Sequence, residues 1–315
     1  MRQNRVSTWR LVLLGCWVLG GAGVSIAPGA TLRWKFAPGD TIRYEMQQKT
    51  TTGIKPATGK GQELKQAMTQ TMQLTWKVKT VSADGSARIA QTIDRVQSKA
   101  ETIFGMFEYD TKAGKAPEGP VAASVVPVAL YKALIGAEFT FTMSPHGDLS
   151  DVKVPESVLK AVRAAGPAGG AGGEAFSEEG LKQMITQSSF ALPKDDLAPG
   201  QTWTRQTKLP SPPIGTTVMD KTYRFDGPDL KAGANVDKIT LTFKVSIEPA
   251  LEEKDKPNPV EVVSQDNSGD FFFDQAAGRI VRSRVHEIVA TKFTAMGIPL
   301  LQSLDSSTSM TLVGK

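Results

Sequence analysis

Apolar and polar residues alternate with a period of two along several segments of the chain. In residues 72–78 the residues Met, Leu, Trp and Val alternate with Gln, Thr and Lys, and residues 139–143 and 239–247 repeat the pattern. Because successive side chains of a β-strand point to opposite faces, each segment is predicted to be a strand with one buried and one solvated face. The enrichment in Thr, Val, Ile and aromatic residues favours the same structure.

Turn sequences separate the predicted strands, and three helical segments interrupt them. Pro-Gly, Asp-Gly and Gly-Asp pairs lie between the strands, at residues 37–40, 82–86, 144–148 and 197–200. Helices are predicted to begin at Pro127, Pro155 and Ser177, because proline suits the first helical turn and serine caps a helix. These patterns predict a mainly β (α+β) fold, with one or more curved antiparallel sheets built from two related halves and about three helices mostly between the halves.

One phrase occurs twice in the chain. FEYD, with a glycine four residues after its Asp, recurs as FFFD with the same glycine spacing. APGDT and LTWKV also recur, as APGQT and LTFKV, at a similar distance along the chain. We interpret this as an internal duplication; the alternative is chance reuse of common turns and strands. Asp bonds to nearby backbone in turns and Gly adopts left-handed conformations, so four residues are interpreted as structural turn residues: Asp110, Gly114, Asp274 and Gly278.

This organisation divides the chain into four segments. They are a signal peptide at 1–27, a first β-rich half with helices at 28–165, a Gly-rich flexible loop at 166–176 and a second β-rich half at 177–315. The loop is predicted to be flexible because backbone rich in glycine loses much conformational entropy when it is ordered.

The N-terminus has the three parts of a secretory signal. Three arginines precede an uncharged apolar run that ends in Ser-Ile-Ala at 25–27. This pattern predicts export to the periplasm or the extracellular space, with an uncleaved membrane anchor as the alternative. LLGC at 13–16 also resembles a lipidation motif, which would place a lipid on Cys16. The short apolar run before Cys16 and the apolar residues after it favour an ordinary signal-peptide cysteine.

Composition restricts the classes of function. Cys16 is the only cysteine, so signal removal would leave neither a disulfide nor thiolate chemistry. The net charge falls from +5 to about +2 when Arg2, Arg5 and Arg10 are removed, and no Lys/Arg cluster with interleaved aromatic residues indicates nucleic acid binding. No later apolar run reaches the roughly 20 residues of a membrane-spanning helix, so no span is predicted after signal removal.

Four phrases carry a resemblance to a known family: TLRWKFAPGDTIRYEM, MQLTWKVKTV, FTFTMSPHGDLSDVK and GDFFFDQAAGRIVRSRV. They resemble a family of uncharacterised secreted bacterial proteins, a planctomycete-type domain of unknown function, over nearly the whole mature chain. The resemblance implies no activity and no catalytic residues. The predicted curved sheet is also similar, more weakly, to the half-barrels of periplasmic lipoprotein carriers, an analogy of fold that does not establish function.

Groups that carry catalysis or bind metals are scarce. His146 in a predicted turn and His286 on a predicted strand are far apart in the sequence and are interpreted as surface or structural residues. The H-E-x-x-H, G-x-S-x-G and Walker motifs are absent. We therefore expect no enzymatic activity, no cofactor and no metal. The enzymatic alternative is a hydrolase that uses two carboxylates across a cleft.

The patterns favour a non-catalytic envelope protein that binds an apolar small molecule or a lipid in a groove between sheet and helices. The predicted lining comes from two alternating strands: Phe139, Phe141, Leu241 and Phe243. Three consecutive phenylalanines at 271–273 predict either a strand buried on both faces or the wall of such a groove. The alternative function is a structural or protein-interaction module of the envelope, with a protein partner and no small ligand.

Overall fold

The computed structural model describes residues 30–59, 61–114, 128–165, 178–187, 189–211, 215–233, 235–249 and 260–314. The predicted signal peptide with Cys16 and the predicted Gly-rich loop at 166–176 lie outside these residues. The described strands of the first part of the chain are β1 (Thr41–Pro56), β2 (Leu64–Val81), β3 (Ala87–Thr102), β4 (Gly105–Asp110), β5 (Phe139–Met143) and β6 (Leu149–Lys153). Those of the second part are β7 (Thr202–Ser211), β8 (Gly215–Pro228), β9 (Val236–Glu248), β10 (Val260–Asp274), β11 (Arg279–Ala295) and β12 (Ile298–Gly314).

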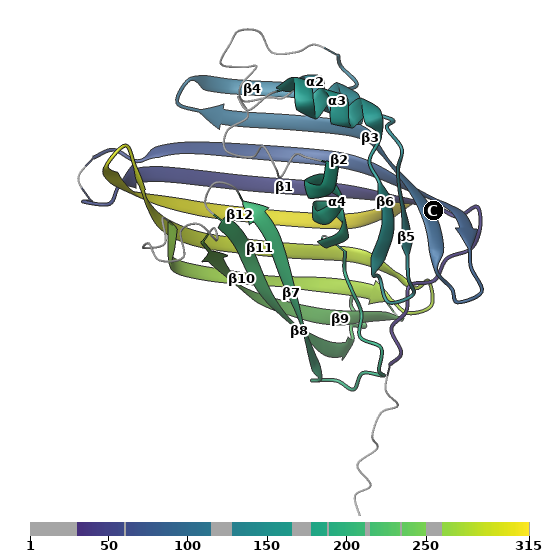
Figure 1. Ribbon diagram of the computed structural model, residues 1–315. Coiled ribbons are helices and arrows are strands. Elements are labelled where there is room, and N and C mark those ends of the chain that lie inside the picture. The colour runs from purple at the N-terminus through teal and green to yellow at the C-terminus, as the bar shows by residue number, and fades with distance from the viewer. Residues whose placement is uncertain are drawn as a thin grey trace, which may run out of the picture.

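These strands form one antiparallel sheet, so the prediction of a mainly β fold is confirmed. Its strand order is β6-β5-β3-β2-β1-β12-β11-β10-β9-β8-β7, with β4 paired to β3 (Figure 1). The first and last strands pair along most of their length, with Thr50 opposite Ser306 near the middle. This pairing joins the strands of the two parts of the chain into a single sheet.

The predicted strands lie within β2, β5 and β9, and their alternation corresponds to real burial. In β9, Ile239, Leu241 and Phe243 are buried while the intervening side chains are more accessible. The phenylalanines of 271–273 are covered on both faces, because Phe271 stacks on Phe190 at 4.4 Å and the Arg282 guanidinium lies 4.2 Å from the centre of the Phe272 ring. Period-two patterning therefore identified both the strands and the face that each buries.

Short helices α2 (Val128–Leu134), α3 (Glu156–Ala165) and α4 (Glu178–Gln187) lie where the sequence places them. The sheet curves so that β5 and β6 on one side and β7 and β8 on the other turn over the same face, which we call the inner face (Figure 1). Helix α4 contacts both β6 and β7. It therefore links the two ends of the strand order across the inner face.

The main core fills one end of the inner face. Two extended segments cover it, residues 30–36 and 190–197, and they are joined by reciprocal hydrogen bonds between Ala30 and Leu197 of 2.8 and 3.0 Å. Trp34 lies at the centre, with its ring centre 6.1 Å from that of Trp76 and 5.8 Å from that of Phe273. Dense packing of large side chains therefore closes this end of the sheet.

A smaller core lies beneath α2. Tyr131 of α2 stacks on Tyr109 of β4 with ring centres 6.1 Å apart, over Ile93 and Val96 of β3. Burial raises the pKa of the Tyr131 hydroxyl, so the group stays neutral. The ring contact positions α2 over β3 and β4.

Side-chain amides replace the backbone ladder where β9 and β10 separate. The two strands pair from Asp274 only as far as Ser268. Beyond that point Gln265 accepts a hydrogen bond from the Val245 N–H (2.6 Å) and donates one to the Val245 carbonyl (3.0 Å), and Asn267 donates to the Phe243 carbonyl (3.3 Å). The backbone N–H and C=O of Val245 and the C=O of Phe243 thereby have hydrogen-bond partners although β9 and β10 diverge.

The repeated Asp and Gly residues form similar turns. The Asp110 carboxylate accepts from the Lys112 N–H (2.9 Å) and that of Asp274 accepts from the Ala277 N–H (2.8 Å). Gly114 and Gly278 follow with φ of 71° and 61°, a left-handed conformation that glycine adopts without strain. The second turn joins β10 to β11 in a hairpin, whereas the residues after Gly114 lie outside the described chain.

The other repeated phrases fall on strands with different neighbours. APGDT leads into β1 at the middle of the sheet, and APGQT leads into β7 at the far end of the strand order. LTWKV lies in β2, the next strand after the first phrase, but LTFKV lies in β9, two strands after the second. The repeated phrases therefore mark the same kind of local structure at unlike places in the sheet.

Candidate ligand-binding site

The four residues predicted to line a ligand groove are buried in the protein interior. Phe139 and Phe141 lie on β5, and Leu241 and Phe243 lie on β9. Phe141, Leu241 and Phe243 belong to the main core, where the Phe141 ring meets that of Trp76 edge-on at 6.0 Å. These side chains pack against protein atoms, and they are not among the residues around the cavity described next.

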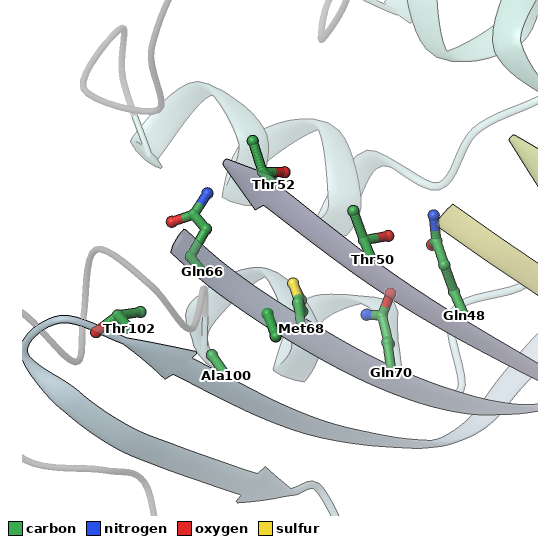
Figure 2. Close-up of a pocket in the computed structure, with 9 residues that line it drawn as sticks. Gln48, Thr50, Thr52, Gln66, Met68, Gln70, Ala100 and Thr102 are labelled. Atoms are coloured by element: carbon green, nitrogen blue, oxygen red, sulfur yellow. The ribbon is translucent and has the colours of Figure 1, made fainter. Parts of the chain in front are cut away.

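A cavity of about 340 Å³ lies on the inner face beyond the main core, over β1, β2 and β3 (Figure 2). Its lining consists of amide, hydroxyl and small or flexible apolar residues: Gln48, Thr50, Thr52, Gln66, Ala67, Met68, Gln70, Ala100 and Thr102. Sheet register brings the central members together, since Thr50, Met68 and Ala100 face one another across three adjacent strands. Cross-strand neighbours of this kind lie about 5 Å apart.

None of the described lining residues carries a charged side chain. Amide groups of Gln48, Gln66 and Gln70 can both donate and accept hydrogen bonds, and the threonine hydroxyls can do the same. Met68 and the buried Ala100 contribute apolar surface between them. The arrangement can therefore hold an uncharged molecule that has both apolar and hydrogen-bonding parts.

Neighbouring elements hold two walls of this cavity in place. The Thr50 and Ser306 hydroxyl oxygens are 3.1 Å apart across β1 and β12. The Gln70 amide donates a 3.0 Å hydrogen bond to the Tyr131 hydroxyl of α2. Because Tyr131 is itself fixed by the smaller core, α2 sets the orientation of Gln70, whose side chain rises from the sheet on the same side as that of Gln48 in Figure 2.

A carboxylate and an ammonium group lie further across the inner face. Glu287 of β11 pairs with Ser306 of β12, which in turn pairs with Thr50 of β1. Lys221 of β8 pairs with Phe243 of β9. Burial raises the pKa of Glu287 and lowers that of Lys221, and the attraction between the two charges partly offsets each effect. The inner face thus places its charged pair outside the cavity lining.

Within the described residues, the two carboxylates whose pKa is raised, Asp237 and Glu287, do not meet in a cleft. Burial raises the pKa of Asp237 as it does that of Glu287. Asp237 pairs with Phe273, whereas Glu287 lies in the row of Phe243, six residues further along β9. At about 3.3 Å per residue the two rows are roughly 20 Å apart, so the two groups cannot act on one bond.

The remaining titratable residues of interest make local contacts. Two hydrogen bonds from the Arg95 guanidinium to the Asp110 carboxylate lower the pKa of Asp110 to about 2. His146 Nδ1 lies 3.2 Å from the Pro193 carbonyl, and His286 Nε2 lies 2.9 Å from an Asp305 carboxylate oxygen at the surface. Throughout the described part of the chain, no three His, Cys, Asp or Glu side chains gather as metal ligands would.

Sequence reasoning missed the cavity residues, although a signal for them exists. Inward positions of β1 run Ile42, Tyr44, Met46 and then change to Gln48 and Thr50. In β2 the inward Gln66 and Gln70 interrupt a similar series. Polar residues at the buried phase of an alternating strand indicate that this part of the face is not packed core.

One protein family matches part of this chain. Residues 84–230 match a family of unknown function (DUF6263). The match covers just under half of the chain, and over these residues the resemblance to an uncharacterised family is confirmed. No curated protein matches the sequence. The family match brings neither an activity nor site residues to this protein.

Two solved structures show limited similarity. A lipovitellin structure, described as showing lipid–protein interactions, has 13% identity and a TM-score of 0.48, covering 89% of this chain and 26% of that one. DynF, from the dynemicin biosynthesis pathway of Micromonospora chersina, has 8% identity and a TM-score of 0.21, and the match covers 95% of this chain and 92% of the DynF chain. The chain therefore spans about a quarter of the lipovitellin chain that it matches. Within its described residues, none of its helices is both long and apolar enough to cross a membrane.

Proposed function

We propose that this is a non-catalytic protein of the cell envelope that binds an uncharged, lipid-like molecule on the inner face of its sheet. The observation that carries the proposal is the cavity over β1, β2 and β3, whose lining is polar but uncharged. The N-terminal pattern supports an envelope location, because it is typical of a secretory signal. The ligand would then be a component of the envelope.

The chemistry of the lining selects against a charged ligand. Moving an ion from water into a cavity without a countercharge is strongly unfavourable. Lys221 and Glu287, the charged pair of the inner face, are not part of the lining. A molecule with ester, hydroxyl or amide groups beside an apolar chain could instead bond to the Gln and Thr side chains and contact Met68 and Ala100.

The size and rigidity of the cavity suit binding. Its volume falls within the range of roughly 300–1,000 Å³ that is typical of small-molecule sites. Contacts from Ser306 and Tyr131 hold two of its walls before any ligand arrives. Preorganisation of this kind reduces the entropy lost on binding.

The test compares two tryptophan variants on adjacent residues of β1. Thr52→Trp fills the cavity, whereas Thr51→Trp places the same ring on the opposite, exposed face of the strand. Protein exported from the full chain is titrated with a fluorescent diacylglycerol and with a fluorescent phosphatidic acid of equal chain length. We expect the native protein and Thr51→Trp to prefer the neutral probe, and Thr52→Trp to bind it at least tenfold more weakly.

Unfolding midpoints of both variants show whether either change disturbs the fold. Native mass spectrometry of gently extracted protein supplies a second readout, an added mass that is present in the native protein and reduced in Thr52→Trp. Equal affinity of both variants for the neutral probe, or a preference of the native protein for the anionic probe, would contradict the proposal.

A further inference from the structure

Exposed apolar side chains gather on three hairpin turns. Six large apolar residues at these turns are exposed to solvent: Leu64 after the β1–β2 turn, Ile103, Phe104 and Met106 at the β3–β4 turn, and Met296 and Ile298 at the β11–β12 turn. Phe104 is 69% exposed and Met296 is fully exposed. We call this set the tip cluster. Of the other large apolar residues exposed in the described chain, Leu230 lies on the β8–β9 turn and Val313 lies at the opposite end of β12 from Ile298.

The three turns lie at the same end of the sheet, on the left of Figure 1. The Ala57 N–H after β1 donates a 2.9 Å hydrogen bond to the Pro299 carbonyl at the start of β12, which ties two of the turns together. The third turn follows through the pairing of β2 with β3, where Ala67 stands opposite Glu101. The tip cluster is thus one edge of the molecule, opposite the end that the main core closes.

Folding does not account for the residues at these turns. Met296 and Gly297 have φ of 51° and 78°, the two left-handed positions of a two-residue hairpin loop that favours Asn and Gly. A methionine there is strained and gains no packing in return. At the β3–β4 turn the Thr102 hydroxyl accepts from the Phe104 N–H (3.1 Å), so an ordered backbone presents Phe104 to solvent.

We propose that the tip cluster inserts into the surface of a phospholipid bilayer. Its side chains stand on separate protruding turns, and a fluid lipid surface can accommodate each of them, whereas a protein partner would need a matching depression for every turn. Some of the charged groups beside the turns pair with each other, Lys65 with Glu63 at 3.2 Å and Lys99 with Glu101 at 3.3 Å. Because the tip cluster itself is apolar, we expect its insertion, and not attraction to anionic lipids, to provide the binding, so that zwitterionic lipids are sufficient.

Docking in this way would place the proposed cavity beside the bilayer. Thr102 both lines the cavity and holds the β3–β4 turn. The docking proposal nevertheless stands on the exposed turns alone and does not require that the cavity binds a ligand.

The test is co-sedimentation of the full exported protein with phosphatidylcholine vesicles. The double variant Phe104→Ser with Met296→Asn removes two of the most exposed tip side chains, and Asn suits the left-handed position of Met296. We expect at least a tenfold loss of partitioning for this variant. Leu230→Ser is the matched control, because Leu230 is an exposed apolar residue on the β8–β9 turn at the other end of the sheet; it should bind as the native protein does.

Three results would overturn the proposal. They are no sedimentation of the native protein, equal loss in the Leu230→Ser control, and binding that requires anionic lipid or disappears in salt. Cross-linking of the native protein, but not the tip variant, to an envelope protein in the absence of vesicle binding would identify a protein surface instead. The tip variant should still bind the neutral diacylglycerol probe and Thr52→Trp should still bind vesicles, so failure of one proposal is distinguishable from failure of the other.

Discussion

A substitution at Gly278 tests whether the two copies of the repeated Asp-x-x-x-Gly sequence have different surroundings in the structure. A Cβ atom at Gly278 would lie 2.5 Å from the Lys35 Cβ and Cγ atoms and 2.6 Å from the Lys35 nitrogen. A Cβ at Gly114, the corresponding residue of the earlier phrase, would meet no described atom within 4 Å. Since the two glycines have nearly equal φ, Gly114→Ala is a matched control for Gly278→Ala.

The magnitudes of the two changes follow from these surroundings. Alanine in the left-handed conformation costs about 1 kcal/mol at either position. At Gly278 the clash also threatens the 3.0 Å hydrogen bond from the Lys35 N–H to the Gly278 carbonyl, worth about 1 kcal/mol. Displacement of Lys35 would partly expose its neighbour Trp34, and full burial of a large apolar side chain is worth roughly 1.5–3 kcal/mol. We expect Gly278→Ala to lose about 3–4 kcal/mol and Gly114→Ala to lose about 1 kcal/mol.

Urea unfolding followed by tryptophan fluorescence measures both losses. A third variant locates the cause, because Lys35→Gly removes the Cβ and Cγ atoms involved in the clash. Combined with Gly278→Ala it should recover part of the stability, which a double-mutant cycle would report as coupling between the two sites. Equal losses at Gly278 and Gly114, or an absence of coupling with Lys35, would refute the reasoning.

Two further predictions concern pH. Asp110→Asn should lower the free energy of unfolding by about 1 kcal/mol near neutral pH. Hydrogen bonds from Arg95 hold the pKa of folded Asp110 at about 2, below the unfolded value of 3.8, so the difference between variant and native protein should vanish as pH falls through about 2. A difference that persists at the lowest pH would contradict this. Glu287→Gln should have the opposite dependence, since burial raises the pKa of Glu287 above its unfolded value of 4.5. The variant should match the native protein in acid and become relatively more stable as pH rises above 4.5, as measured by urea midpoints across pH, and a relative loss of stability would show that attraction to Lys221 outweighs burial.

Local patterning predicted much of the fold. Alternation identified the segments that became β2, β5 and β9, and Pro155 preceded α3 as expected for a residue at a helix start. These features depend on neighbouring residues, since a strand or a helix shows its buried face within a few positions. The left-handed turn at Gly278 was predictable for the same reason.

The location of the candidate site was not predictable in this way. Phe141 and Leu241 carry the apolar pattern expected of a groove lining, but the structure places them in packed interior. Whether an inward apolar side chain meets other protein atoms or an open cavity depends on what covers it. Here the cover comes from residues 30–36 and 190–197, which are distant in sequence from both strands.

The amino-acid sequence by itself determined the alternating strands at 72–78, 139–143 and 239–247, the face that each of them buries and several turns, because these follow from side-chain periodicity and backbone preference over a few residues. Only the tertiary structure decided that β1 pairs with β12, that the Gln and Thr positions of β1 and β2 surround a cavity, and that three apolar turns share one edge. The reason is physical: strand order and cover are set by the best total burial among segments far apart in the chain, such as those that bring Thr50 to Ser306, and no local pattern records that choice.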